Sequence, residues 1–216
     1  MKRCLVLNPN TTVAVTEGVV QACRRAQPAL QWEGRTASFG APYIADEATY
    51  AVAAHAVLEA YDTAQDDHDV VLVACFGDPG LLALRERARV PVLGLAQSSL
   101  VAAARHGRFA VITGGRAWGP MLERFARAHR LDASLVGIYT VDLTGAQIAA
   151  DPQRALDDLE AAARRGVVRG AQAVLVGGAA LTGLAALLQP RFELPLLDNV
   201  LLAAQAVADA LALPSA

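Results

Sequence analysis

Cys75 is the residue whose type and neighbours point most directly to chemistry. It follows the apolar run 70–73 and opens the string Cys-Phe-Gly-Asp-Pro-Gly. A thiol at the junction of a buried strand and a helix start can be stabilised as a thiolate by free backbone N–H groups, which predicts a lowered pKa. Such a group can take a proton from carbon or return one. We interpret Cys75 as an acid/base residue, the alternative being an ordinary buried cysteine, which suits Cys4 and Cys23 better.

The remaining residue types argue against several kinds of catalysis. Lys2 is the only lysine among the 19 basic residues, so a Schiff-base lysine and a P-loop lysine are both missing. The four histidines and three cysteines show no metal-ligand spacing, and no Gly-x-Gly-x-x-Gly follows the first apolar run. We therefore expect neither a metal nor a cofactor.

Charge and hydropathy indicate a small-molecule partner. The formal net charge of −2 predicts no nucleic acid and no anionic membrane held by bulk electrostatics. Residues 170–190 carry no charged side chain, but their glycines favour a buried strand, a turn and a helix start over a membrane span. The opening apolar run is too short for a signal peptide, so we expect a soluble, cytoplasmic protein.

Apolar runs of strand length alternate with stretches of helical spacing. The expected strands are 4–7, 70–73, 90–95, 109–112, 135–141, 174–176 and 194–197, and the clearest helices are 13–26, 47–64, 121–129 and 152–168. Near-continuous Val, Leu and Ile runs between helices are typical of parallel sheets covered on both faces.

The chain also repeats itself. Residues 71–81 resemble 174–184, residues 90–94 resemble 194–198, and residues 3–8 resemble 108–113. The offsets are 103, 104 and 105 positions, and the three segments keep their order. A general likeness between any two βα units is the alternative to a duplication.

We predict an α/β fold of two pseudo-symmetric, doubly wound domains, each with a small parallel sheet. The first domain would comprise residues 1–97 with a C-terminal helix at about 200–216, and the second residues 98–199. Ligands of such sheets bind beyond the carboxyl ends of the strands, so we expect the active site in the cleft between the domains. Thr11 or Thr12 suits the N-cap of the first helix.

Three strings resemble the aspartate/glutamate/hydantoin racemase superfamily, and its hydantoin and allantoin racemase branch most closely. They are Asn-Pro-Asn-Thr at 8–11, Ala-Cys-Phe-Gly-Asp-Pro-Gly-Leu at 74–81 and Pro-Val-Leu-Gly at 91–94. The resemblance covers most of the chain. It implies a two-domain α/β enzyme that self-associates, needs no cofactor or metal, and uses two cysteines on opposite faces of the substrate carbon.

The second cysteine of that family is missing here. By resemblance Cys75 is the first, while the family's Gly-Cys-Ala-Gly-Met-like string corresponds to residues 177–181 and puts Gly178 at the second position. A single thiol exchanges a proton on one face only, unless water or another group serves the other. Arylmalonate decarboxylase resembles this logic, with one cysteine and a glycine at the other position, although the cysteine retained here is in the opposite half.

The resemblance implies thiol acid/base chemistry at a carbon next to a carbonyl, on a hydantoin-like or small carboxylate substrate. The alternatives are a decarboxylase of the arylmalonate type and an inactive, ligand-binding relative. Cys75 would be catalytic, with the backbone at Phe76, Gly77, Gly178 and Ala179 around the oxyanion, Asn8 and Thr113 on polar substrate atoms, and Tyr43 and Tyr139 either reaching the cleft or packing.

Overall fold

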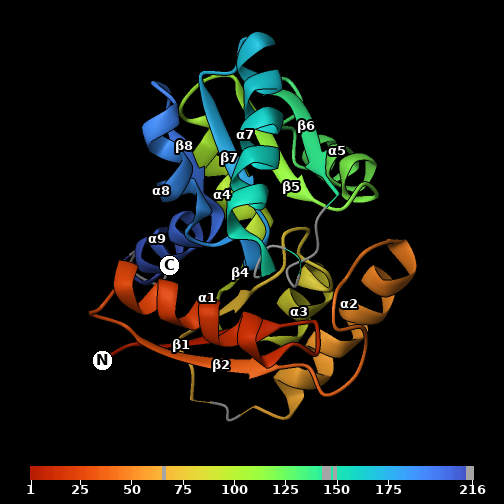
Figure 1. Ribbon diagram of the computed structural model, residues 1–216. Coiled ribbons are helices and arrows are strands. Elements are labelled where there is room, and N and C mark those ends of the chain that lie inside the picture. Colours follow the sequence, from red (N-terminus) through yellow and green to blue (C-terminus); the bar gives the residue numbers. More distant parts are fainter. Residues whose placement is uncertain (65–66, 143–146, 148–149, 213–216) are drawn as a thin grey trace. The chain divides into compact units, whose positions relative to one another are not determined.

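The computed structural model describes residues 1–64, 67–142, 147 and 150–212. The chain forms two compact units, one of Met1–Ser98 with Val200–Ala216 and one of Ser99–Asn199 (Figure 1). Residues 213–216 of the expected C-terminal helix lie outside the described residues. Each unit holds one four-stranded parallel sheet, so the α/β class with two such sheets is confirmed.

The sheet of the first unit has the strand order β2-β1-β3-β4. Its strands are β1 (Arg3–Asn8), β2 (Gln31–Thr36), β3 (Val70–Val73) and β4 (Val92–Gly94). The helices that follow them are α1 (Val13–Ala26), α2 (Glu47–Asp62), α3 (Leu81–Arg87) and α4 (Leu95–Ala104). Helix α4 begins in this unit and continues from Ser99 in the second unit. The last helix of the chain, α9 (Asn199–Ala212), belongs to this unit from Val200 onward, and there Gln27 Nε2 donates to Gln205 Oε1 at 2.8 Å.

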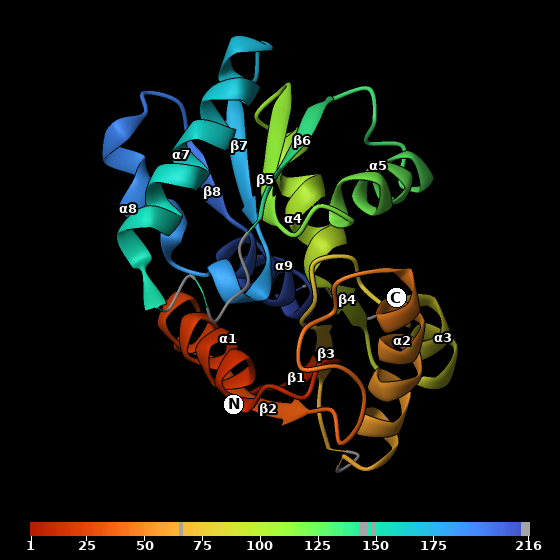
Figure 2. The same cartoon turned by 45° about the vertical axis from the view of Figure 1, so that its right-hand side comes forward.

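Helices cover both faces of this sheet. Alternate strand residues such as Leu5 and Val71 pack with Val57 of α2 and Leu84 of α3 in one buried cluster. Successive strand residues point to opposite faces, so Val6 and its neighbours face the other side, where α1 lies (Figure 2). The near-continuous apolar strands follow from this double cover.

Strand β2 is the element that the apolar runs did not predict. Its sequence Gln-Trp-Glu-Gly-Arg-Thr is polar, and only Trp32 is buried. It lies at the edge of the sheet and pairs with β1 alone, so little of it needs to be apolar.

The second unit repeats the topology, with the strand order β6-β5-β7-β8. Its strands are β5 (Phe109–Gly114), β6 (Leu135–Val141), β7 (Ala173–Gly177) and β8 (Leu196–Asp198). Its helical segments are α5 (Trp118–Ala128), α7 (Pro152–Val168), η1 (Ala179–Leu181), α8 (Leu184–Leu188) and η2 (Gln189–Arg191). Helices α7 and α8 lie on one side of this sheet, and α5 and α4 on the other (Figure 2).

The sequence repeat is reproduced in the pairing of the strands. Leu7 of β1 pairs with Val73 of β3, and residues 105 and 103 positions later, Ile112 and Val176, pair in the same way. Val71 pairs with Val92, and the corresponding residues 174 and 196 pair as well. By this register Gly178 occupies the position equivalent to Cys75.

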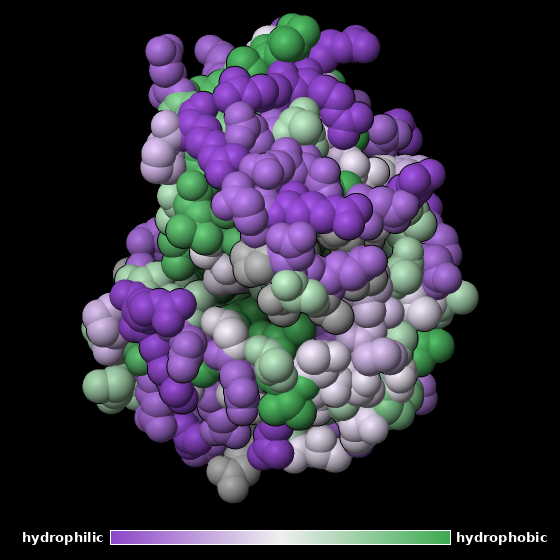
Figure 3. All heavy atoms as spheres, viewed as in Figure 1, coloured by the Kyte–Doolittle hydropathy of each residue, from purple (hydrophilic) through white to green (hydrophobic). Residues whose placement is uncertain are grey.

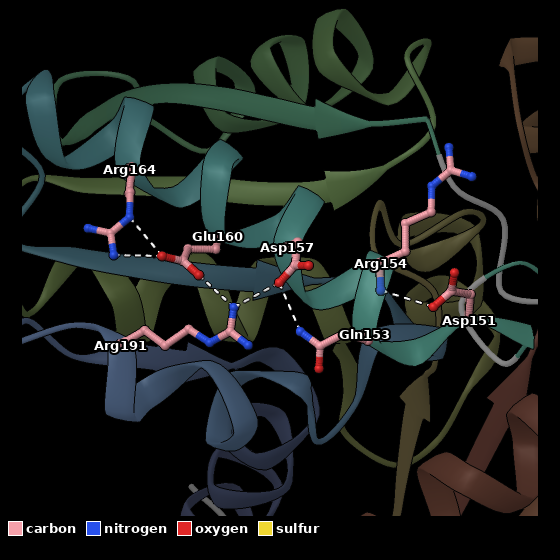
Figure 4. Close-up of polar contacts among 7 residues, drawn as sticks. All are labelled: Asp151, Gln153, Arg154, Asp157, Glu160, Arg164 and Arg191. Atoms are coloured by element: carbon pink, nitrogen blue, oxygen red, sulfur yellow. Dashed lines mark hydrogen bonds and ion pairs between the residues drawn. The ribbon is translucent and has the colours of Figure 1, made fainter.

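Helix α7 presents a charged outer face, seen as hydrophilic surface in Figure 3. On that face Arg191 of η2 donates to Glu160 at 2.6 Å and to Asp157 at 3.1 Å, and Glu160 also accepts from Arg164 (Figure 4). These ion pairs tie η2 to α7, and they lower the pKa of Glu160 because two guanidinium groups donate to its carboxylate.

None of the helices among the described residues is both long and apolar enough to cross a membrane. The segment 170–190 instead contains β7, η1 and α8, in keeping with the expected strand, turn and helix start.

Candidate active site

The strand order places the candidate residues at the switch point of each sheet. In the first sheet the order reverses between β1 and β3, and ligands of doubly wound sheets bind beyond the carboxyl ends at such a point. Asn8 ends β1, and Cys75 follows β3 by two residues. In the second sheet Thr113 near the end of β5 and Gly178 after β7 occupy the corresponding positions.

Asn8 organises its own loop. Its side chain is fully buried, and Nδ2 donates to Asn10 Oδ1 at 2.9 Å, to the Thr12 carbonyl at 3.2 Å and to Thr16 Oγ1 at 2.9 Å. Its Oδ1 accepts from the Asn10 N–H at 3.2 Å. Thr12 is the N-cap of α1, but its hydroxyl donates to the Pro42 carbonyl instead of capping the helix. The amide of Asn8 thus stabilises the loop, and a substrate contact through it stays a prediction.

The Cys75 turn is fixed by backbone hydrogen bonds. The carbonyl of Cys75 accepts from the N–H of Gly77 at 2.9 Å and of Asp78 at 3.0 Å. The Tyr50 hydroxyl on α2 donates to the Gly77 carbonyl at 2.7 Å, which holds the turn from the side. Since the Gly77 N–H is engaged in this turn, a role for it at an oxyanion stays a prediction. Phe76, which lies between Cys75 and Gly77 in the sequence, is buried.

Cys75 does not sit at a helix N-terminus, and the expectation of a lowered thiol pKa is wrong. Helix α3 begins only at Leu81, after Gly80 in a left-handed conformation. Burial of the thiol raises the pKa of Cys75, and the nearby carboxylate of Asp78 raises it further. The thiol is therefore protonated at neutral pH, as is Cys4, whose pKa burial and Asp69 raise to about 12.

Asp78 is a buried carboxylate held by the first turn of α4. Its Oδ1 accepts from the Ala96 N–H and its Oδ2 from the Gln97 N–H, each at 2.8 Å. A Cβ at Gly94 would lie 2.1 Å from Oδ2, so only glycine at this position leaves room for the carboxylate. Burial raises the pKa of Asp78 to about 7, although the two N–H donors and Arg85 oppose that shift.

The second unit carries no thiol at its switch point. Gly178 adopts φ 131°, a conformation that L side chains rarely take, and a Cβ there would lie 3.3 Å from Leu181 Cγ and 3.8 Å from Thr113 Oγ1. Thr113 is buried, and Ala179 opens the short η1 segment. Asp198 ends β8 and accepts from the Gly183 N–H at 2.6 Å.

The two tyrosines differ in position. Tyr43 lies half-buried in the loop after β2, whose Ala41 and Pro42 carbonyls bind the loop after β1, so it is at the carboxyl edge of the first sheet. Tyr139 pairs in register with Ile112 inside β6 and packs on the core, with the Arg165 guanidinium 5.2 Å from its ring centroid. The structure gives Tyr139 a packing environment.

Sequence reasoning missed three residues of the Cys75 environment: Tyr50, Asp78 and Gly94. Asp78 lies inside the recognised string. A further signal was the alignment of Gly94 with Asp198, which puts a carboxylate at the end of the fourth strand in the second half and none at the same position in the first half. Nothing in the sequence pointed to Tyr50. Among the residues that the structure describes, no three His, Cys, Asp or Glu side chains form a group suited to a metal ion.

A family model described as "Asp/Glu/Hydantoin racemase" matches residues 4–207, and the chain belongs to this family. It is 30% identical over 207 residues to a hydantoin racemase of Paenarthrobacter aurescens, covering 92% of this chain and 86% of that protein. Allantoin racemase from Klebsiella pneumoniae has the same two-domain fold, with a TM-score of 0.92, 27% identity, and coverage of 98% and 88%. A mutant arylmalonate decarboxylase shares the fold alone, with a TM-score of 0.71, 15% identity, and coverage of 100% and 94%.

Proposed function

We propose that this racemase-family protein is a cofactor-independent enzyme that transfers a proton at a carbon next to a carbonyl, with Cys75 as the group that moves the proton. The observation that carries the proposal is the place of Cys75, two residues after β3 at the switch point of the first sheet, in the string that the family resemblance singles out. Carbon acids of this kind become planar enolates when they lose a proton, and a thiol beside the carbon can return one.

The protonation state of the thiol favours the donor direction. Burial and the Asp78 carboxylate keep the proton on Cys75 in the ligand-free protein. A neutral thiol can give its proton to an enolate carbon at once, whereas removal of a proton from substrate requires that the thiol first lose its own. We therefore propose that the ligand-free protein holds Cys75 in the form that can protonate the substrate carbon.

The proposed substrate is hydantoin-like. Relatives over most of the chain are named hydantoin racemase, and a fold neighbour at 27% identity is named allantoin racemase. A hydantoin presents a C–H next to a ring carbonyl, which is the carbon acid that the proposed chemistry needs. Small amino acids with a free carboxylate are the other members of this substrate class.

A second candidate is decarboxylation, favoured by Gly178. Because Gly178 has no side chain, the second unit supplies no thiol at the position equivalent to Cys75. In a decarboxylation the bond to the departing carboxylate breaks, carbon dioxide leaves, and the electron pair stays as an enediolate. The Cys75 proton then goes to the carbon, and water restores the thiol. One thiol is enough for this sequence.

Chiral chromatography distinguishes the candidates. Enantiopure 5-substituted hydantoins, allantoin, aspartate and glutamate are incubated with wild type and with Cys75→Ala, and arylmalonates are followed by release of carbon dioxide. Inversion that requires Cys75 supports the racemase reading, and carbon dioxide release that requires Cys75 supports the decarboxylase. Saturable binding of a hydantoin by wild type, with no turnover of any hydantoin, amino acid or arylmalonate, would contradict both and would make the protein a ligand-binding relative.

A further inference from the structure

We propose that Asp78 is a positioning residue for Cys75: its buried carboxylate, fixed on the first turn of α4 in the space that Gly94 leaves, holds a negative charge on the turn that carries the thiol. The inference deepens the proposed function and rests on it, since a thiol that stays protonated is the form that can protonate a carbon. Asp78 acts through Cys75 and need not touch substrate.

The carboxylate is fixed from two sides. Both oxygens accept a backbone N–H of α4 at 2.8 Å, and Gly94 at the end of β4 leaves the room that they occupy. The backbone of Asp78 itself adopts φ 54°, an uncommon conformation for a non-glycine residue. Only 3% of the residue is exposed, so its charge is poorly screened by water.

The same turn links this charge to the thiol. The Asp78 N–H donates to the Cys75 carbonyl at 3.0 Å, so the two residues belong to one hydrogen-bonded turn. A negative charge beside a thiol disfavours the thiolate, which is the second cause, after burial, of the raised pKa of Cys75. Arg85 of α3 is a further charged group that acts on the carboxylate, and it also donates to Gln97 Oε1 at 2.7 Å.

The second unit shows what the carboxylate does apart from the thiol. There Asp198, at the end of the fourth strand, occupies the position equivalent to Gly94. Its carboxylate accepts from the Gly183 N–H of the loop after β7, so here the carboxylate comes from the fourth strand and the N–H from the loop. Both units therefore join the loop after the third strand to the end of the fourth strand through a carboxylate. Only in the first unit is that carboxylate on the turn of a cysteine, which gives it a chemical role as well as a structural one.

The test is the rate of Cys75 alkylation by iodoacetamide between pH 5 and pH 9, in wild type and in Asp78→Asn. Cys75→Ala supplies the background from Cys4 and Cys23. The pKa of Asp78 is about 7, so its carboxyl group is neutral at pH 5 and charged at pH 9. In wild type the charge therefore disfavours the Cys75 thiolate at pH 9 but not at pH 5. We expect the ratio of the variant rate to the wild-type rate to rise about tenfold from pH 5 to pH 9, the effect of one unit of thiol pKa.

A structural role alone predicts a different result. If Asp78→Asn merely loosened the turn, the thiol would react faster by the same factor at every pH, and a pH-independent ratio would overturn the proposal. Asp78→Ser, with a hydroxyl that can still accept one N–H of α4, serves as a second neutral variant if the amide does not fold. No substrate is used, so a pH-dependent ratio in a protein that turns over no carbon acid would refute the proposed function and leave this inference standing.

Discussion

At the scale of single residues, one turn holds two buried ionisable groups, the Cys75 thiol and the Asp78 carboxylate, and the charge of one disfavours ionisation of the other. Asp78 carries a carboxylate out of water and recovers part of that cost from two backbone donors, while Cys75 keeps its proton beside it. A charge buried in this way alters the stability of the fold as well as the reactivity of the thiol, because the folded and unfolded chains bind protons differently.

Asp78 therefore predicts a pH dependence of stability. Its carboxyl pKa is about 7 in the folded protein and about 3.9 when unfolded, so between these values the folded state binds more protons. The contribution of Asp78 to the free energy of unfolding is fully present below pH 4, falls as pH rises to 7, and is then constant. In urea unfolding from pH 4 to pH 8, the free energy of unfolding of wild type should fall relative to that of Asp78→Asn by on the order of 4 kcal/mol.

A difference that stays constant across this range would show that Asp78 is ionised throughout in the folded protein. The two N–H donors would then outweigh the burial of the carboxylate. Other titrating groups cancel in the comparison, since the variant keeps them.

The direction of the Cys75 shift could not be predicted from sequence because it depends on a turn. The string after β3 contains two glycines and a proline, and it indicated a helix start beside the thiol. In the structure the chain first makes a tight turn through Asp78, and helix α3 begins six residues after Cys75. The Asp78 carboxylate, which helps to raise the pKa of Cys75, belongs to the recognised string. The sequence alone does not show that it lies near the thiol, because that depends on the folded turn.

At the scale of elements, the junction of β4 and α4 is tightly constrained. Strand β4 ends at Gly94, and the next residue already begins α4. The N–H groups of the first helical turn have no partner within the helix, and the Asp78 carboxylate meets two of them. The junction needs a glycine so that a side chain from another loop can cap the helix.

Two glycine-to-alanine changes separate this constraint from ordinary glycine effects. Gly94→Ala places a methyl group 2.1 Å from the Asp78 carboxylate and should destabilise the protein by about 1–3 kcal/mol. Gly18→Ala, inside α1 with no atom within 4 Å of the new methyl group, should stabilise it by about 0.5–1 kcal/mol. Urea denaturation followed by circular dichroism measures both. Equal stability of Gly94→Ala and wild type would refute the packing account.

The elements themselves were predicted unevenly. Helices α1 and α7 have the bounds that the spacing of their apolar residues indicated, and buried strands such as β3 follow their apolar runs. Strand β2 was missed because an edge strand can be polar, and α8 is too short for a helical period to show. Apolar runs thus predict strands that are buried on both faces, and they do not predict strands that are only partly buried.

At the scale of the whole molecule, a duplicated topology carries unequal halves. The strand pairings repeat with the sequence offsets, yet the equivalent positions after β3 and β7 hold a cysteine and a glycine with φ 131°. The repeat was visible in the sequence because strand residues are constrained in the same way in both halves. The different backbone at Gly178 was not visible, since glycine tolerates almost any conformation.

This asymmetry makes Gly178→Cys informative when compared with Gly178→Ala. Both variants place a side chain at positive φ beside Leu181 and should lose about 1–3 kcal/mol of stability. We expect only the cysteine to increase inversion of a hydantoin stereocentre, because it adds a second thiol at the position equivalent to Cys75. Chiral chromatography measures this gain. A folded Gly178→Cys protein that inverts no faster than Gly178→Ala would indicate a site adapted to one thiol.

The most direct test of the central claim is proton NMR in heavy water with each enantiomer of a 5-substituted hydantoin, using wild type and Cys75→Ala. We predict that wild type exchanges the proton next to the carbonyl faster than the spontaneous rate, and that Cys75→Ala lowers the exchange to that rate. Exchange that persists undiminished in Cys75→Ala would contradict the assignment of Cys75 as the group that moves the proton, and exchange that never exceeds the spontaneous rate in wild type would contradict proton transfer on a hydantoin.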